Sequence, residues 1–224
     1  MQATGQNTGG QLKTEVIFPN GYEPLLDKKE NDIAIKKIKD IFEAGLSKQL
    51  NLTRVTAPRF VRSETGINDD LNGIERPVVF TVEGAGRVKA EIVHSLAKWK
   101  RMALMEYRMK HGEGLYTDMD AIRAQEILDN IHSAYVDQWD WELVIEARER
   151  NLEFLKEVVR KIYSEMRETE QQICSRFPSV KAVLAEDITF VHTEDLIEEY
   201  PGLSPSERED EICRKHGSVF LIGV

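Results

Sequence analysis

The sequence predicts an α+β fold in which helices flank an antiparallel or mixed sheet. Strands and helices follow one another irregularly along the chain, and several early strands are predicted to be linked as hairpins. A regular strand–helix–strand repeat is absent from the sequence pattern, and so are the GxGxxG and phosphate-loop motifs. These three observations favour strands that pair with their neighbours in the chain.

The composition is typical of a globular protein. The 224 residues include 41% hydrophobic and 31% charged side chains, and the formal net charge is −9. This acidic balance argues against a nucleic-acid-binding surface as the main function. The longest dense apolar run, residues 219–224, is far shorter than the roughly 20 residues of a membrane-spanning helix, so we expect no membrane partner. Two cysteines, and histidines without HxxxH spacing, predict a reducing, cytoplasmic setting and no metal site made by protein ligands.

The first elements are a tail, a helix and an interrupted strand. Residues 1–17 are rich in Gln, Gly and Thr, and we expect them to be disordered. Apolar residues at helical spacing predict an amphipathic helix over residues 31–50. Its apolar face consists of Ile35, Ile38, Ile41, Phe42 and Leu46. The segment 51–61 is typical of a strand that Pro58 interrupts.

A polar loop, residues 63–76, separates this strand from the middle of the chain. Residues 78–82 and 88–93 flank a glycine-rich turn and predict a hairpin, and residues 95–107 predict a helix. Further elements are predicted in sequence order. They are a short strand at 115–119, a loop at 120–130, a strand at 131–141 and the longest helix at about 142–174.

The last part of the chain alternates strands with short helices. Residues 188–191 predict a strand and residues 194–200 a helix. Ser204, Pro205 and Glu207 form the pattern of a capping box, which predicts a helix that ends at Gly217. Residues 219–224 are apolar on both faces and predict a buried strand.

Two polar segments are candidates for a site. In residues 94–101, Ser95 and Lys100 would border one cleft if Ser95 caps the helix; the alternative is a solvated basic face. In residues 136–141, Gln138 and Asp140 would share one strand face, and the flanking tryptophans favour packing. The alternative there is an edge strand with a wet outer face.

A third candidate is Arg123, with Glu126 close behind it. An arginine at a strand end can hold a phosphate through its planar fork, although a surface arginine is the commoner case. The Asp69–Asp70 pair is likewise more often a loop cap than a site.

Several of these segments resemble one known family. They are VHSLAKWKR (93–101), GEGLYTDM (112–119), IHSAYVDQWDWE (131–142), ITFVHTEDL (188–196) and SVFLIGV (218–224). With DDLNGIE (69–75) and LNLTRVTAPRF (50–60), they are similar to the ammonia-dependent asparagine synthetases, the aspartate–ammonia ligases. The resemblance covers roughly residues 18–224.

The resemblance implies a class II aminoacyl-tRNA synthetase-like catalytic domain over residues 18–224, assembled as a homodimer. It implies ATP-dependent ligation of ammonia to L-aspartate through a β-aspartyl-adenylate, with Mg²⁺ at the phosphates. Matched position by position, the residues of the family's site have three roles. The catalytic residues are Asp69, Arg123 and Gln138, the substrate-binding residues are Ser95, Lys100 and Asp140, and Arg123 also binds the nucleotide.

Two departures from the family pattern stand out. Gln125 occupies a position that is usually acidic, and the sequence stops at Val224, where the family continues into glycine-rich segments that cover the nucleotide. We therefore expect these residues to be the N-terminal two-thirds of such an enzyme and to be inactive alone. The alternative function is a degenerate, non-catalytic binding module of the same fold. Aminoacylation of tRNA is disfavoured, because no anticodon-binding domain precedes the catalytic segment.

Overall fold

The computed structural model describes residues 17–69 and 75–223, and these form two compact units. Within the described ranges, unit 1 contains residues 17–23, 55–69, 75–108 and 116–142, and unit 2 contains the remainder. The expected disordered tail lies outside the described residues except for Ile17, and Asp70 lies outside them as well. No helix in the described part of the chain is long and apolar enough to cross a membrane.

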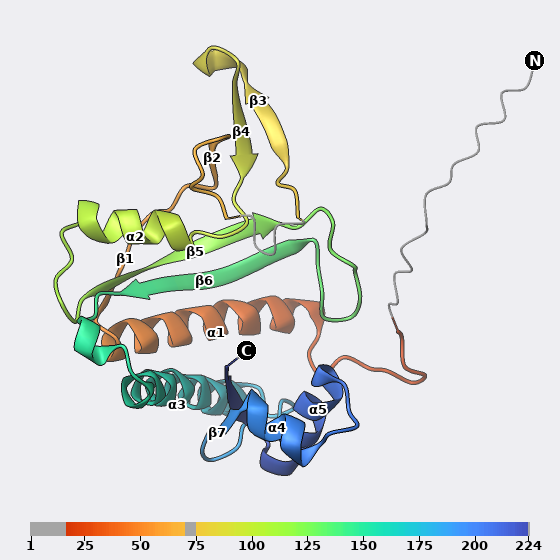
Figure 1. Ribbon diagram of the computed structural model, residues 1–224. Coiled ribbons are helices and arrows are strands. Elements are labelled where there is room, and N and C mark those ends of the chain that lie inside the picture. The colour runs from red at the N-terminus through yellow and green to blue at the C-terminus, as the bar shows by residue number, and fades with distance from the viewer. Residues whose placement is uncertain (1–16, 70–74, 224) are drawn as a thin grey trace, which may run out of the picture. The chain divides into compact units, whose positions relative to one another are not determined.

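Unit 1 contains the predicted hairpin within an antiparallel sheet (Figure 1). Strands β3 (Val79–Val82) and β4 (Val88–Ile92) pair with each other, and a 3-10 turn joins them. Gly86 closes this turn at φ 74°, a left-handed conformation that favours glycine. Strand β2 (Phe60–Arg62) pairs antiparallel with the other edge of β4, which gives the order β2-β4-β3. The hairpin prediction is confirmed.

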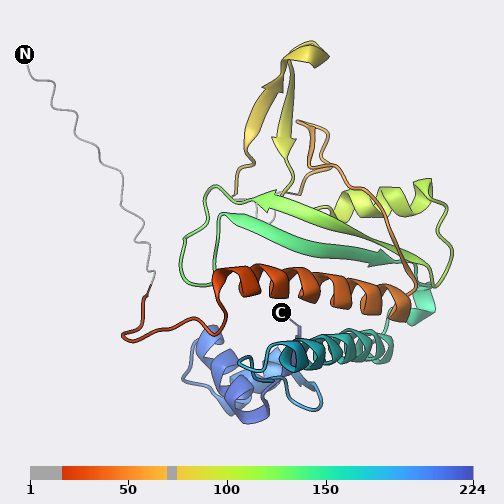
Figure 2. The ribbon, with the colours of Figure 1, turned by 180° about the vertical axis from the view of Figure 1, so that it is seen from behind.

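Helix α2 (Ala97–Glu106) and most of strands β5 (Gly114–Ile122) and β6 (Tyr135–Leu143) complete unit 1. β5 and β6 are antiparallel neighbours, and α2 lies beside β5 (Figures 1 and 2). The prediction of a loop from residue 120 was wrong, because β5 continues to Ile122. Its Asp120 forms an ion pair with Arg59 and accepts a hydrogen bond from the Tyr135 hydroxyl at 2.6 Å, which accommodates an acidic residue within a strand.

A small apolar core connects these elements of unit 1. It brings together one residue of β2, the segment before α2 and two residues of β5. The buried members are Val61, Val93, Leu96, Met119 and Ala121. Leu96 and Val93 are essentially inaccessible to solvent. The start of α2 is thereby fixed beside β5, and this determines where the first polar residues of α2 lie.

Unit 2 is built on two long helices, α1 (Lys28–Gln49) and α3 (Leu152–Arg176), which pack along each other (Figure 2). Asp27 caps α1 through a capping box with Glu30. The predicted buried face of α1 was partly wrong: Ile35 and Ile38 are exposed. The buried residues of α1 are Ala34, Phe42 and Leu46, and Ala34 packs on the C-terminal part of α3. Phe42 and Leu46 of the predicted face are therefore confirmed.

Helix α3 begins at Leu152 and not at about residue 142. Residues 142 and 143 complete strand β6, and a 3-10 turn covers Ala147–Glu149. Asn151 then caps the helix by accepting a hydrogen bond from the Phe154 N–H at 2.9 Å. This N-cap side chain is a signal in the sequence that predicts the observed start.

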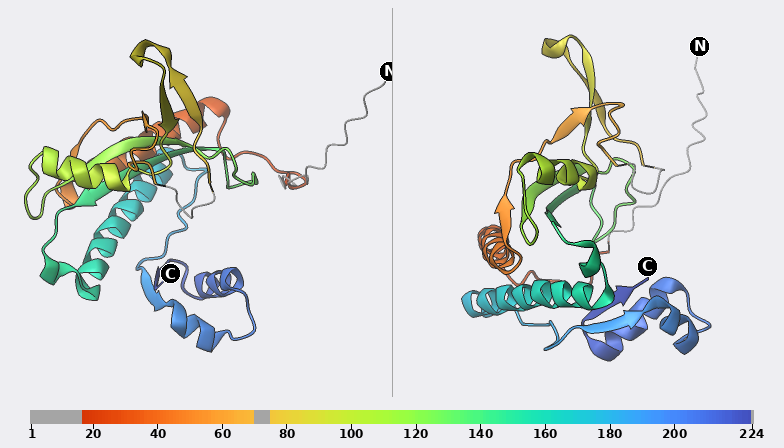
Figure 3. Two further views of the ribbon diagram at one scale, coloured as in Figure 1. Left: turned by 45° about the horizontal axis from the view of Figure 1, so that its top comes forward. Right: turned by 60° about the vertical axis from the view of Figure 1, so that its left-hand side comes forward.

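The chain leaves α1 through β1 (Leu52–Arg54), and the break between β1 and β2 around Pro58 is confirmed. Near the C-terminal end, β7 (Thr189–His192) and β8 (Val219–Ile222) form a parallel pair (Figure 3). β8 is half-buried and not buried as predicted, because β7 is its one strand partner among the described residues.

Two helices connect β7 to β8. They are α4 (Thr193–Glu199) and α5 (Pro205–His216). The Ser204–Glu207 capping box at the start of α5 is confirmed, as is the end of the helix at Gly217, whose φ is 77°. A parallel strand pair needs a crossover of this kind, which a tight hairpin turn cannot provide.

Candidate functional site

Lys100 is the most deeply buried charged residue described in unit 1. It lies on the face of α2 that packs inward, and it is 4% exposed. Its Nζ forms an ion pair with the Asp140 carboxylate, donates to the Trp141 carbonyl oxygen at 3.1 Å and lies 3.7 Å from the Glu142 carboxylate. A desolvated ammonium requires compensation of this kind. The structure thus brings together Lys100 and Asp140, two of the residues that the resemblance implies for substrate binding.

Strand β6 presents Gln138, Asp140 and Glu142 on one face, because alternate residues of a strand point the same way. The Gln138 amide contacts the Met119 Sδ at 3.2 Å, which places it against β5. Glu142 was missed as a site candidate. It was assigned to the start of the long helix, whereas as a strand residue it continues the polar alternation of Gln138 and Asp140.

Asp69 lies beside the first turn of α2. Its carboxylate pairs with the Lys98 Nζ at 2.9 Å, and its side chain is 21% exposed. The preceding Asn68 is buried and makes two hydrogen bonds: it donates to the Ile92 carbonyl oxygen at 3.1 Å and accepts from the His94 N–H at 2.7 Å. The Asn68–Asp69 segment is therefore attached to the end of β4.

Ser95 lies just before α2 but is not its N-cap, which is Leu96. The Ser95 hydroxyl accepts a hydrogen bond from the Ala97 N–H at 3.2 Å. Ser95 thus faces the first backbone donors of the helix, close to the position expected for a cap. Asn68, and the pairing of Lys98 with Asp69, join this region through tertiary contacts, which the sequence pattern does not display.

Arg123 follows β5 directly, and its backbone N–H donates to the Ala134 carbonyl oxygen at 2.7 Å. Its Nη1 lies 3.7 Å from the Glu126 carboxylate, too far for a hydrogen bond. Its Nε is buried and has no hydrogen-bond partner among the described residues. The Arg123 guanidinium therefore retains an unsatisfied donor. Gln125, the unusual residue of this segment, accepts a hydrogen bond from the Arg76 N–H at 2.9 Å.

The connection between β5 and β6 carries further polar contacts. The backbone N–H of Ile131 is the main cause that lowers the pKa of Asp129, and the His132 ring adds to it. At the start of β6, the hydrogen bond to Asp120 raises the pKa of Tyr135. These groups stabilise the turn and the strand ends, and none of them is a sequence-predicted site residue.

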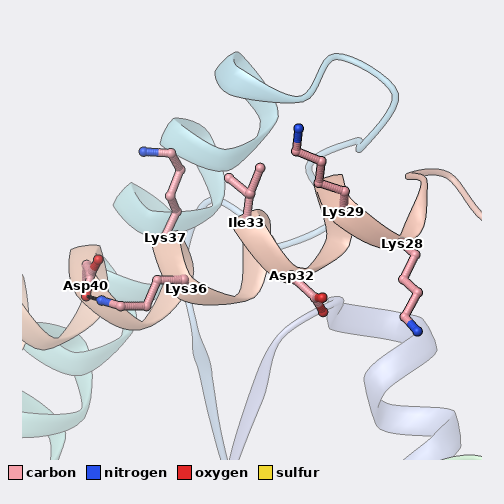
Figure 4. Close-up of a pocket in the computed structure, with 7 residues that line it drawn as sticks. All are labelled: Lys28, Lys29, Asp32, Ile33, Lys36, Lys37 and Asp40. Atoms are coloured by element: carbon pink, nitrogen blue, oxygen red, sulfur yellow. Dashed lines mark hydrogen bonds and ion pairs between the residues drawn. The ribbon is translucent and has the colours of Figure 1, made fainter.

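A shallow hollow on α1 is a separate polar surface (Figure 4). It is lined by Lys28, Lys29, Asp32, Ile33, Lys36, Lys37 and Asp40. All seven residues come from one helix, and Lys36 pairs with Asp40 one turn further along. None of the sequence-predicted site residues lines it. We therefore assign the candidate site to unit 1, where Lys100, Asp140 and Glu142 form one contact group, Asp69 and Lys98 a second, and Arg123 and Glu126 a third.

Comparison with known families identifies the chain. The family profile of aspartate-ammonia ligase matches residues 29–224. The chain belongs to this family. An aspartate–ammonia ligase of Clostridium perfringens is 56% identical over 210 residues, which are 94% of this chain and 62% of the relative. One of Bacteroides thetaiotaomicron is 53% identical over 209 residues, 93% of this chain and 61% of the relative. The chain thus spans about three-fifths of the length of these relatives.

Solved structures identify the fold. The asparaginyl-tRNA synthetase of Pyrococcus horikoshii, complexed with asparaginyl-adenylate, matches with a TM-score of 0.57 at 13% identity over 87% of this chain and 45% of that chain. That of Entamoeba histolytica, also with asparaginyl-adenylate, matches with a TM-score of 0.56 at 14% identity over 87% of this chain and 43% of that chain. The predicted class II aminoacyl-tRNA synthetase-like fold and the family resemblance are both confirmed.

Proposed function

We propose that the protein catalyses the ATP-dependent ligation of ammonia to L-aspartate, which yields L-asparagine, AMP and pyrophosphate through a β-aspartyl-adenylate. Membership of the aspartate-ammonia ligase family supports this reaction. Because the chain spans 62% of the length of a relative with this name, the proposal concerns the whole protein. The expectation that a polypeptide of residues 1–224 is inactive by itself stays a prediction, and its test is AMP release by that polypeptide.

The observation that carries the proposal is the buried Lys100, whose Nζ lies near the carboxylates of Asp140 and Glu142. An amino acid is a zwitterion, so its carboxylate would meet the Lys100 ammonium while its ammonium meets Asp140. Binding then exchanges one set of ion pairs for another, and no buried charge is left without a counter-charge. Gln138 on the same strand face and Ser95 at the start of α2 would supply neutral hydrogen bonds that orient the substrate.

The unsatisfied donor of Arg123 supports a role at the nucleotide. In the first step the side-chain carboxylate of aspartate attacks the α-phosphorus of ATP, and the bond to pyrophosphate breaks. Negative charge grows on the α-phosphate oxygens during this displacement, and a forked guanidinium stabilises it. We assign this role to Arg123.

In the second step ammonia attacks the acyl carbon, the bond to AMP breaks and a proton is released. We assign Asp69 to this step, because a carboxylate is suited to bind the incoming ammonium or ammonia. In the structure the Lys98 ammonium occupies this carboxylate at 2.9 Å. Lys98 therefore serves as the resting counter-charge of Asp69.

Magnesium, a homodimer and a cytoplasmic location belong to the same proposal. The described residues contain no group of three or more His, Cys, Asp or Glu side chains placed to hold a metal ion. Mg²⁺ at nucleotide sites is held largely by phosphate oxygens and water, with one or two carboxylates. We therefore assign the Mg²⁺ of the proposed reaction to the phosphate oxygens of ATP and water.

The experiment measures AMP release by the whole protein with L-aspartate, ATP and ammonium. We expect release that depends on all three, and its loss in Lys100→Met. Lys89→Met is the matched control, because Lys89 is an exposed lysine of β4 in the same unit. Absence of AMP release from a folded, monodisperse wild-type protein would contradict the proposal and favour the non-catalytic alternative.

A further inference from the structure

His94 is a buried, titratable residue to which the mechanism above gives no role. It lies between the end of β4 and the start of α2 and is 2% exposed. Neither of its ring nitrogens has a hydrogen-bond partner among residues 17–69 and 75–223, and neither touches solvent.

Stability does not explain a histidine at this position. A neutral imidazole carries one donor and one acceptor, and buried polar groups are hydrogen-bonded in the great majority of cases. An apolar side chain of similar size would fill the same space without leaving two polar atoms unsatisfied. The two unsatisfied ring nitrogens of His94 therefore need an explanation other than packing.

The surroundings of His94 connect it to the candidate site. Its backbone N–H donates to Asn68 at 2.7 Å, and Asn68 also donates to the Ile92 carbonyl oxygen. The backbone of His94 is thus the point at which the Asn68–Asp69 segment is attached to the segment that continues into Ser95. Both of these neighbours are assigned to substrate chemistry.

We propose that the His94 imidazole is a substrate-binding group, and that the amino-acid substrate supplies the hydrogen-bond partner it lacks. One ring N–H donates to a carboxylate oxygen of L-aspartate, while the other nitrogen remains an acceptor. Because both nitrogens are inaccessible to solvent in this structure, the proposal requires that the groups around the ring move when the substrate binds. This inference rests on the proposed function.

Two measurements on the whole protein test it. The first follows the ring ¹⁵N resonances of His94 by NMR during titration with L-aspartate alone; they are assigned by comparison with His94→Gln. The second measures aspartate affinity by calorimetry for wild type and His94→Leu. We expect the His94 resonances to shift on saturation. We also expect His94→Leu to have an unchanged or higher melting temperature but about 10- to 100-fold weaker aspartate binding, the loss typical of one hydrogen bond to a charged group.

Each of the two measurements can overturn the inference about His94. Aspartate binding by wild type without a shift of the His94 resonances would overturn the inference, and so would wild-type affinity in His94→Leu. If His94→Leu does not fold, the titration of the wild-type protein decides alone. Failure of the wild-type protein to bind aspartate at all would overturn the proposed function together with the inference, and the calorimetry of the wild type identifies that case.

Discussion

Two lysine–aspartate pairs in this molecule have the same chemistry and opposite surroundings. Lys36 and Asp40 are one turn apart on α1, and their side chains are 71% and 58% exposed. Lys100 and Asp140 come from a helix and a strand of unit 1, and their side chains are 5% and 20% exposed. Water solvates both members of the first pair whether or not they meet, but it solvates Lys100 hardly at all.

The difference shows that burial, and not the contact itself, determines how much the loss of one partner of an ion pair costs. An exposed pair contributes little, because solvent screens the attraction and the long side chains lose freedom. A buried pair must stay compensated, since a remaining partner would be left as an unpaired charge. In the proposed function, the charged groups of the substrate therefore replace the partners of the buried pair.

The largest expected effect is that of Lys100→Ala in the whole protein. Asparagine formation should be lost, because the substrate carboxylate loses its counter-charge in a desolvated site. The loss of a charge-assisted contact costs about 1.5–3 kcal/mol or more. AMP release and urea unfolding measure the two effects. Near-wild-type turnover at ordinary aspartate concentration would remove Lys100 from the site.

Arg123→Ala should slow aspartate-dependent pyrophosphate–ATP exchange by about 10²–10³-fold, the scale of one preorganised electrostatic donor. Aspartate binding should change much less, because the charge that Arg123 stabilises grows only as phosphorus is attacked. Arg87→Ala is the control, since Arg87 pairs with Glu83 on the exposed hairpin turn. Equal exchange rates in both variants would make Arg123 an ordinary surface residue.

The double variant Lys100→Met, Asp140→Leu sharpens the contrast between the two pairs. Removing both charges should recover about 1 kcal/mol or more of the stability lost in Lys100→Met, because no unpaired Asp140 remains. Activity should stay lost. A double-mutant cycle by urea unfolding measures the coupling, and the same cycle at Lys36 and Asp40 should give a value near zero. Equal coupling at the two pairs would contradict the argument from burial.

The partly exposed His111–Glu149 pair of unit 2 should make the stability depend on pH. The backbone N–H of Glu146, and then the His111 ring, hold the pKa of Glu149 below its ordinary value. The stabilising contribution of Glu149 is therefore fully present above the ordinary pKa of glutamate and is lost as the pH falls through the lowered pKa. Urea unfolding of wild type and Glu149→Gln between pH 7 and pH 3 should converge at the acid end. A constant difference would rule out this titration.

The smallest expected effect is that of Lys36→Met, which should change the free energy of unfolding by no more than about 0.5 kcal/mol. It should leave AMP release unchanged. A clear loss of activity would mean that the lysine surface of α1 has a part in the reaction.

Capping residues and turn glycines in the sequence predicted the elements that begin or end at them. The capping box at Ser204 and the glycine at 217 predicted α5, and the glycine-rich turn predicted the β3–β4 hairpin. The early start predicted for α3 ignored Asn151. The loop predicted from residue 120 did not take into account that Arg59 and Tyr135 accommodate Asp120 in the strand. Ile35 and Ile38 had helical spacing, but which side of α1 is buried depends on where α3 packs.

The candidate site was predictable to the extent that it lies on one element. Strand alternation predicted that Gln138 and Asp140 share a face, and it predicts Glu142 once β6 is extended. The two segments are about 40 residues apart, so no spacing in the sequence predicts that Lys100 contacts these acids. The family resemblance was what implied that Lys100 and Asp140 belong to one site. The contacts of Asn68 and Lys98 with their partners are tertiary, and no spacing in the sequence displays them.

The two hydrogen bonds of Asn68 have a consequence for how this region opens. They connect the residue before Asp69 to both Ile92 and His94 across more than twenty residues of chain. Local unfolding that releases Asp69 from this position must break the contacts at the end of β4 at the same time. The amide protons of His94 and its neighbours in β4 should therefore exchange with solvent deuterium as one cooperative group. The residues that Asn68 connects, before Asp69 and at the end of β4, should then share a single free energy of opening and become accessible to solvent at the same time.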